Sequence, residues 1–197
     1  MLRGRCANCQ KPISLRYPIV ETLTGLLFIY AFSRYHLQLE FFFIVLFFCA
    51  MIVVALIDFS FQVIPDIISI PGIVLGIMYQ IIKGEFVIGL AGMFFGGGLI
   101  LLIRVIGGRV YKKEVMGLGD VYLTAMIGSF VGFPFIIPAI FIAALVGAVL
   151  GIWYIASTHQ SRESPIPFGP FLAMGGVAVI IFQSQITAFF AFLGVYL

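Results

Sequence analysis

Two aspartates, Asp58 and Asp120, stand out because each lies at the edge of a long apolar stretch. Asp58 follows the apolar run at 41–57, and Asp120 ends a Gly-Leu-Gly-Asp motif that opens the run at 119–132. A charged side chain at the centre of a spanning helix costs roughly 2.5–3.5 kcal/mol, so an aspartate near membrane depth usually has a partner or a task. We therefore predict that Asp58 and Asp120 form one catalytic pair.

The chemistry available to such a pair is general acid and base catalysis. Two carboxylates that share a site cannot both ionise easily, so one pKa rises and the pair holds a proton near neutral pH. One aspartate can then activate a water molecule while the protonated one polarises a scissile carbonyl, as in aspartic proteases. Structural alternatives stay open for each: Asp58 as a helix-end residue in interfacial water, and Asp120 as a helix N-cap.

Residues next to the pair are expected to shape the site. Gly117 and Gly119 carry no side chains, which would let an extended peptide approach the Asp120 carboxylate closely. Pro65 marks irregular backbone just beyond the 41–57 run. Asp66 follows it and is typical of an acidic residue at a helix N-terminus, where the helix dipole favours negative charge.

The composition indicates which elements must position these residues. Hydrophobic residues make up 62% of the 197-residue chain, charged residues 10%, and the mean hydropathy is +1.20, whereas soluble proteins carry about 25% charged residues. We predict an all-α, polytopic membrane bundle in which residues 18–197 form the membrane domain and residues 1–17 a polar cytoplasmic segment. A helix needs roughly 20 residues to cross the ~30 Å hydrocarbon layer, which suggests about seven transmembrane helices, within a range of six to eight. The apolar runs fall at 18–33, 41–57, 67–82, 86–106, 119–132, 134–156 and 168–184, with an apolar tail to Leu197.

The basic residues predict the orientation. With seven spans, the N-terminus and the loops at 104–118 and 157–166 share one side, which then carries nine of the eleven Lys and Arg residues. Arg34 and Lys83 fall on the opposite side. The positive-inside rule therefore predicts a cytoplasmic N-terminus, and it puts both aspartates at cytoplasmic helix ends.

Other chemistries are poorly supplied by this sequence. His36 and His159 are the only histidines, and neither belongs to a metal-binding His-Glu motif or a serine triad. Cys6 and Cys9 have the spacing of half a zinc site, but a structural zinc takes four ligands, so zinc here would need a second chain or a further segment. Gly-rich phosphate loops are absent, and no nucleic-acid partner is expected.

Several ordered motifs cover nearly the whole chain. They are Cys6-x-x-Cys9, Ile13-Ser14-x-Arg16-Tyr17-Pro18-x-x-Glu21, Asp58 with Ile64-Pro65-Asp66, Gly117-Leu118-Gly119-Asp120, and Pro167-Phe168-Gly169-Pro170-Phe171-Leu172. With these motifs the chain resembles the bacterial type IV prepilin peptidases, which are polytopic aspartic proteases of the Gly-x-Gly-Asp type. The resemblance implies that Asp58 and Asp120 are catalytic, and that the enzyme removes the basic leader from prepilins or pseudopilins of type IV pilus and type II secretion systems. It also implies cleavage at the cytoplasmic face of the bacterial inner membrane. A basic leader would be recognised partly through acidic groups near the site, for which Asp66 and Glu21 are the candidates; the alternative for each is an ordinary helix-end charge.

The chain differs from full-length members of that family at its start. Those members carry an extra leading transmembrane segment and a first cysteine pair, and many methylate the new N-terminus with S-adenosylmethionine. We therefore expect proteolysis without a cofactor, S-adenosylmethionine only if methyltransferase activity is retained, and an incomplete zinc site at Cys6 and Cys9. The remaining alternatives are another Gly-x-Gly-Asp protease, of the presenilin or archaeal preflagellin type, and an ion-coupled membrane carrier whose aspartates bind ions.

Overall fold

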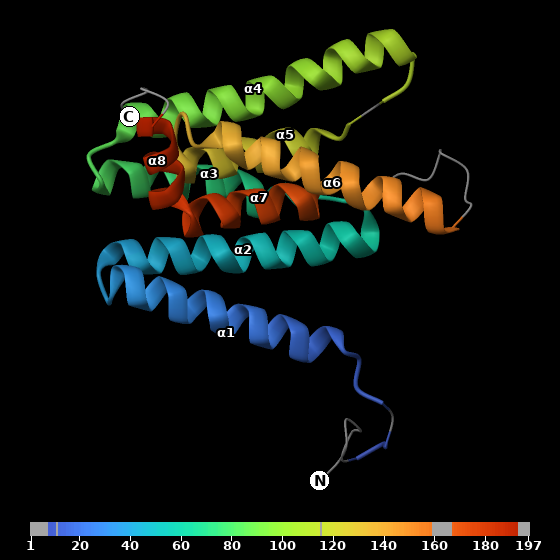
Figure 1. Ribbon diagram of the computed structural model, residues 1–197, viewed down its shortest axis with the longest axis horizontal. Helices are drawn as coiled ribbons and strands as arrows, with labels where there is room; N and C mark the ends of the chain where they lie inside the picture. The colour runs from blue at the N-terminus through green and yellow to red at the C-terminus, as the bar shows by residue number, and fades with distance from the viewer. Residues whose placement is uncertain (1–7, 11, 115, 159–166, 193–197) are drawn as a thin grey trace.

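The computed structural model describes residues 8–10, 12–114, 116–158 and 167–192, and its elements in these residues are eight α-helices (Figure 1). They are α1 (Arg16–Tyr35), α2 (Leu39–Phe61), α3 (Asp66–Ile82), α4 (Phe86–Tyr111), α5 (Leu118–Val131), α6 (Ile136–Thr158), α7 (Gly169–Ile181) and α8 (Gln183–Phe192). The predicted all-α bundle is confirmed, and each apolar run coincides with a helix to within a few residues. The last run is divided, because the chain bends by 75° between α7 and α8. The division of the chain between residues 17 and 18 stays a prediction.

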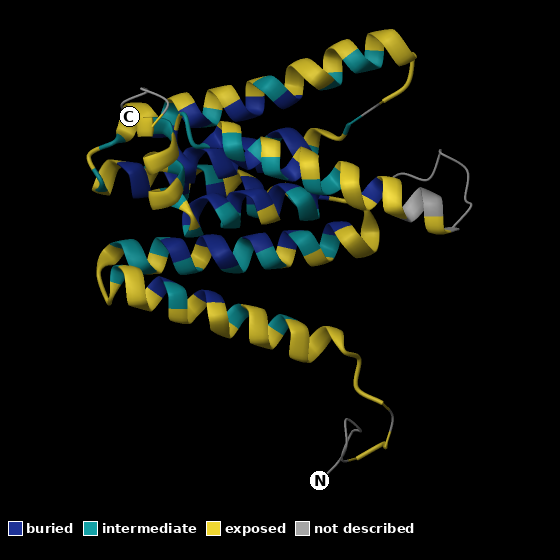
Figure 2. Cartoon of the chain, in the orientation of Figure 1, coloured by how far each residue is buried: buried dark blue, intermediate teal, exposed yellow. Residues whose placement is uncertain are grey.

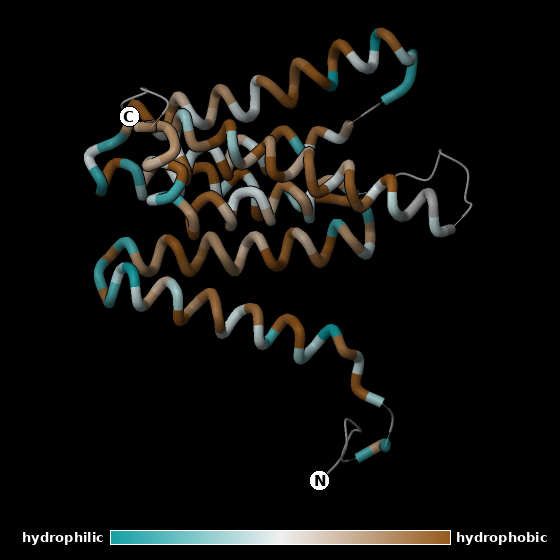
Figure 3. Tube along the Cα trace, viewed as in Figure 1, coloured by the Kyte–Doolittle hydropathy of each residue, from teal (hydrophilic) through white to brown (hydrophobic). Residues whose placement is uncertain are grey.

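Hydrophobic residues predominate along the helices, and hydrophilic residues lie mainly near the helix ends and turns (Figure 3). A helix satisfies its backbone hydrogen bonds internally except at its two ends, and a lipid environment requires this of a spanning segment. Among the described residues, α2, α4 and α6 are long and apolar enough to cross a membrane, and α7 with α8 would make a fourth, bent span. Because α3 and α5 are shorter apolar helices, the figure of about seven complete crossings stays a prediction.

Successive helices from α1 to α7 run back and forth, so α1, α3, α5 and α7 begin where α2, α4 and α6 end (Figure 1). We call this the proximal end of the bundle, on the right in Figure 1, and the opposite end the distal end. The described basic residues near the proximal end are Arg16, Arg104, Arg109, Lys112 and Lys113. Arg34 and Lys83 lie near the distal end.

Helix α5 forms the centre of the bundle, and its residues from Asp120 to Val131 are buried except for the half-buried Tyr122 (Figure 2). It packs most extensively against α4 and α3. The α4–α5 crossing is close because Gly92 and Gly128 bring backbone against backbone: a Cβ on either glycine would collide with the other's carbonyl group. Small residues at helix crossings are the usual means of close packing in membranes.

The helices that begin at the proximal end are shorter than those that end there. Helices α3, α5 and α7 have 17, 14 and 13 residues, against 23, 26 and 23 for α2, α4 and α6. At about 1.5 Å per residue, α5 is roughly 21 Å long and α4 roughly 39 Å. The chain therefore runs back from the end of α4 to reach the start of α5 (Figure 1). This difference in length leaves a hollow at the proximal end.

Candidate active site

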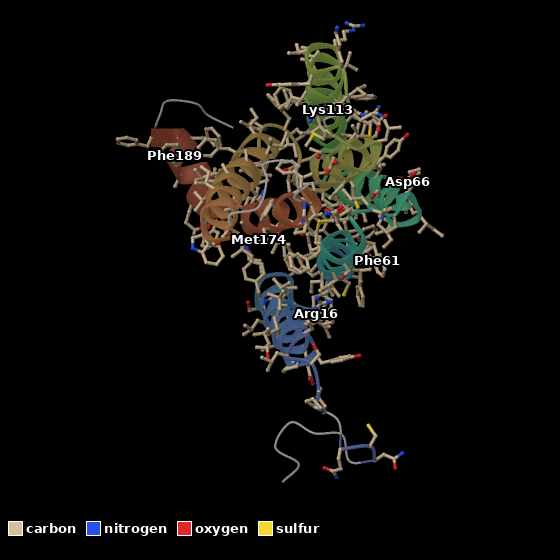
Figure 4. The ribbon with its side chains drawn as sticks, turned by 90° about the vertical axis from the view of Figure 1, so that its right-hand side faces the viewer. Arg16, Phe61, Asp66, Lys113, Met174 and Phe189 are labelled. Atoms are coloured by element: carbon tan, nitrogen blue, oxygen red, sulfur yellow. The ribbon has the colours of Figure 1, made fainter. Side chains whose placement is uncertain are left out.

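A cavity of about 620 Å³ lies at the proximal end, where the C-terminal end of α2 meets the N-terminal ends of α3, α5 and α7. Figure 4 looks at this end of the bundle, with Asp66 and Phe61 labelled near the α2–α3 connection. The residues that line the cavity are Asp58, Gln62, Val63, Ile64, Asp66, Met116, Gly117, Gly119, Asp120, Pro167 and Phe168. The structure thus brings the two predicted catalytic aspartates to one cavity.

Asp58 lies in the last turn of α2 and is only 5% exposed. Its Oδ2 atom accepts a hydrogen bond from the backbone N–H of Gly169, with an N–O distance of 2.9 Å. Gly169 is the first residue of α7, so the Asp58 carboxylate lies at the positive end of a helix other than its own. The negative partial charge at the C-terminus of α2 disfavours a carboxylate there, and the N-terminus of α7 offsets this effect. The hydrogen bond from Gly169 also lowers the cost of burying the Asp58 carboxylate.

Asp120 lies in the first turn of α5 and is 9% exposed. Its Oδ2 atom accepts a hydrogen bond from the backbone N–H of Gly117 at 3.2 Å. Gly117 is the N-cap of α5, so Asp120 is not the cap itself but reaches back to it from the third helical position. The Asp58 carboxylate is close enough to Asp120 to interact with it electrostatically. Two buried carboxylates from distant parts of the sequence therefore act on each other across the cavity.

Three helix N-termini surround the cavity, and their N-cap residues are Pro65, Gly117 and Phe168. The unpaired N–H groups of a first turn carry positive partial charge, worth about 0.3–2 kcal/mol to a nearby anion. Their convergence stabilises negative charge in the cavity, and the described residues that line it include no basic side chain. The site is therefore built to hold buried carboxylates through backbone dipoles.

The two glycines of the motif have different surroundings. A Cβ on Gly119 would lie 2.7 Å from the Cβ of Ile64, so the absence of a side chain lets the α2–α3 connection pack against the start of α5. The space predicted for a substrate peptide is therefore occupied on this side by Ile64. A Cβ on Gly117 would lie 3.4 Å from Asp120 Oδ2, which is ordinary contact. Pro65 is the N-cap of α3 and lies outside the cavity lining, and the site-shaping roles of these three residues stay predictions.

The structure separates the two acidic residues proposed to bind a basic leader. Asp66 is exposed in the first turn of α3 and lines the cavity, as expected of a carboxylate favoured by the helix dipole. Glu21 is exposed on α1 and lies outside the cavity lining. Only Asp66 is therefore placed to meet a ligand at the aspartate pair.

The predicted partial zinc site falls mostly beyond what can be described. Cys6 lies outside the described residues, and Cys9 is exposed with a free thiol. In the described part of the chain, no three His, Cys, Asp or Glu side chains gather where they could hold a metal ion. Zinc at Cys6 and Cys9 stays a prediction.

Sequence reasoning missed the part that Gly169 plays. The residue belongs to the quoted Pro-Phe-Gly-Pro motif, but its hydrogen-bond partner, Asp58, is 111 positions away. A Cβ on Gly169 would lie 2.6 Å from Asp58 Oδ2, so only glycine fits at this distance. The available signal was a glycine directly before Pro170, since proline favours the first turn of a helix and the glycine then exposes its N–H.

Curated relatives align with nearly the whole of this chain. Proteins called prepilin leader peptidase/N-methyltransferase from Legionella pneumophila, Xanthomonas campestris and Pseudomonas aeruginosa are 31%, 32% and 32% identical to it. Each alignment covers 94% of this chain, and the chain spans 66%, 66% and 65% of the three relatives. No solved structure matches the chain.

Two protein-family models also match the sequence. Residues 1–35 match the bacterial peptidase A24 N-terminal domain. Residues 45–152, more than half of the chain and including Asp58 and Asp120, match the type IV leader peptidase family. With the relatives named above, these matches establish that the chain belongs to the type IV leader peptidase family.

Proposed function

We propose that this chain is a membrane-embedded aspartic endopeptidase that removes the basic leader from type IV prepilins or pseudopilins. The observation that carries the proposal is the meeting of Asp58 and Asp120, both buried, at one cavity of about 620 Å³. Family membership supplies the substrate class, because the relatives are named prepilin leader peptidases.

In the proposed mechanism the two aspartates share one proton. One carboxylate takes a proton from a water molecule, and that water attacks the scissile carbonyl, whose oxygen is polarised by the protonated partner. The tetrahedral intermediate collapses when the departing amine receives a proton from the pair. Backbone N–H donors from Gly169 and Gly117 hold one oxygen of each carboxylate, so the pair is oriented before substrate arrives.

The substrate would approach the cavity from the cytoplasm. Among the described residues, five basic side chains lie near the proximal end and two near the distal end, which supports this orientation through the positive-inside rule. A basic leader would then meet the exposed carboxylate of Asp66 at the cavity. Its apolar helix would remain in the bilayer, which places the cleavage site near the aspartates.

Proteolysis by this route needs only water and the two carboxylates. The relatives' names also include N-methyltransferase activity. This chain would use S-adenosylmethionine only if it also methylates the new N-terminus of the cleaved pilin.

The test is leader removal by the purified chain reconstituted in lipid with a prepilin, comparing wild type with Asp58→Asn and Asp120→Asn. Both substitutions keep side-chain volume and remove the acid–base function, so we expect each to lower kcat by at least about 10³-fold. Glu40→Gln is the matched control, since Glu40 lies in the first turn of α2 at the distal end. It should retain wild-type activity.

Three outcomes would contradict the proposal. If cleavage survives both aspartate substitutions, Asp58 and Asp120 are not the acid–base pair. Cleavage confined to substrates other than prepilins would favour another Gly-x-Gly-Asp protease. Solute flux that depends on Asp58 or Asp120 without proteolysis would favour an ion-coupled carrier.

A further inference from the structure

Arg104 lies on α4, outside the cavity lining, yet its side chain bonds the segment that leads into the Asp120 motif. Its Nε–H donates a hydrogen bond to the carbonyl oxygen of Met116 at 2.9 Å. Its Nη2 pairs with Glu114 at 3.2 Å. The guanidinium thus joins the long helix to two points of the segment before α5.

The Met116 carbonyl and the Gly117 N–H belong to one peptide group. On one side of this group Arg104 donates to the carbonyl oxygen, and on the other the N–H donates to Asp120 Oδ2 at 3.2 Å. A donor on a peptide oxygen polarises the peptide and strengthens its N–H as a donor. The chain of contacts therefore runs from a fixed positive charge through one peptide plane to the carboxylate.

We propose that Arg104 is a positioning residue for Asp120, acting through the Met116–Gly117 peptide group. Because the peptide is planar, fixing its oxygen also fixes the direction of its N–H. Arg104 thereby sets both where the Gly117 donor points and how strongly it binds the carboxylate. The proposal rests on the proposed function for its effect on catalysis, but its effect on Asp120 itself does not require that function.

The burial of the two partners shows which Arg104 contact matters. The Arg104 side chain is 24% exposed, whereas that of Glu114 is 84% exposed. An exposed ion pair contributes little to stability, while a partly buried hydrogen bond from a charged donor contributes more. The Met116 bond is therefore the functional contact, and Glu114 orients the guanidinium only weakly.

Few other charges lie near Asp120 among the described residues. Asp58 on α2 interacts with it electrostatically, and Asp66 at the start of α3 lines the same cavity. Of the helices that pack against α5, α4 carries the exposed Arg109 besides Arg104, α3 carries no charge other than Asp66, and α6 and α7 carry none. Neighbouring charges should therefore not compensate for a change at Arg104, and the change should alter the pH at which Asp120 loses its proton.

The test compares Arg104→Gln, Arg104→Lys, Glu114→Gln and Arg109→Gln in the full chain in lipid. The first readout is kcat and KM for prepilin cleavage across pH. The second is the pH dependence of carbodiimide modification of Asp120, located by peptide mass spectrometry in an Asp58→Asn background. This reagent attacks protonated carboxyls, so it follows the Asp120 proton without any substrate.

For Arg104→Gln we expect kcat to fall about tenfold with little change in KM, because the donor to Asp120 weakens. Weakening a donor to the ionised carboxylate keeps Asp120 protonated to higher pH, so its modification profile should move upward by about one pH unit. Arg104→Lys, which retains a charged donor, should show a smaller displacement. Glu114→Gln and the exposed control Arg109→Gln should stay within about twofold of wild type.

An unmoved Asp120 profile in Arg104→Gln would overturn the proposal, even if activity fell, because the loss would then be structural. If Arg104→Gln does not fold, Arg104→Lys replaces it in the comparison. The proposal is then overturned if the pH dependence of Asp120 modification in Arg104→Lys is the same as in the chain with Arg104 intact. Wild-type chain that fails to cleave prepilin would count against the proposed function alone. The Asp120 profile would still decide the role of Arg104.

Discussion

Replacing Gly169 by alanine should disable the site while leaving the fold intact. The added Cβ would lie 2.6 Å from Asp58 Oδ2 and 3.0 Å from its Cγ, whereas ordinary contact begins at 3.4 Å. The Asp58 carboxylate must therefore retreat by roughly 0.8 Å, and a misplacement of ~1 Å can cost about 10²-fold in rate. We expect kcat to fall by about 10²-fold, with KM nearly unchanged because the carboxylate acts mainly in the transition state.

The fold should tolerate this change, because alanine favours a helix more than glycine does and Gly169 is the first residue of α7. The assay is single-turnover cleavage of a prepilin in lipid vesicles, with thermal unfolding measured on the same preparation. Gly98→Ala on α4 is the matched control, since a Cβ there meets nothing within 4 Å. Wild-type kcat in Gly169→Ala, with the chain folded, would refute the claim that α7 positions Asp58 for catalysis.

Three further substitutions test other parts of the structure. Gly92→Ala should lower the free energy of unfolding by about 1–3 kcal/mol in chemical denaturation, because its Cβ would force α4 away from the Gly128 backbone. If Gly92→Ala had the same unfolding free energy as Gly98→Ala, the close α4–α5 crossing would be disproved. Gly119→Ala should lower kcat at least about tenfold by pushing Ile64 away from the motif, and unaltered kinetics would contradict this packing role. Asp66→Lys should raise KM about fivefold for a prepilin with a basic leader but not for one with a neutralised leader. Equal effects on both leaders would exclude Asp66 from recognition.

Much of the fold was predictable because membrane helices are encoded locally. An apolar run of sufficient length must form a helix to satisfy its backbone in lipid, so the runs at 41–57 and 86–106 correspond to α2 and α4. The packing of the three glycines at 96–98 on α4 was not encoded in this local way: a Cβ on Gly96 or Gly97 would press on α5. Gly98 faces open space, which periodicity alone did not reveal.

The order of the apolar segments is enough to put Asp58 and Asp120 at the same end of the bundle. Helices that run back and forth alternate their ends, so counting spans and locating Lys and Arg residues is enough to match the two depths. The same local information indicated that Asp66 would open a helix, as it does in α3. These conclusions need only the order and composition of the segments.

The groups that hold each carboxylate become visible only when the helices are packed together. The Gly169 N–H reaches Asp58 across 111 positions of sequence, and Arg104 reaches Asp120 through the peptide between Met116 and Gly117. Such contacts depend on the lateral packing of helices, which hydropathy and spacing do not specify. The cavity arises for the same reason: α3, α5 and α7 are shorter than the helices around them, and only their assembly turns that difference in length into a site.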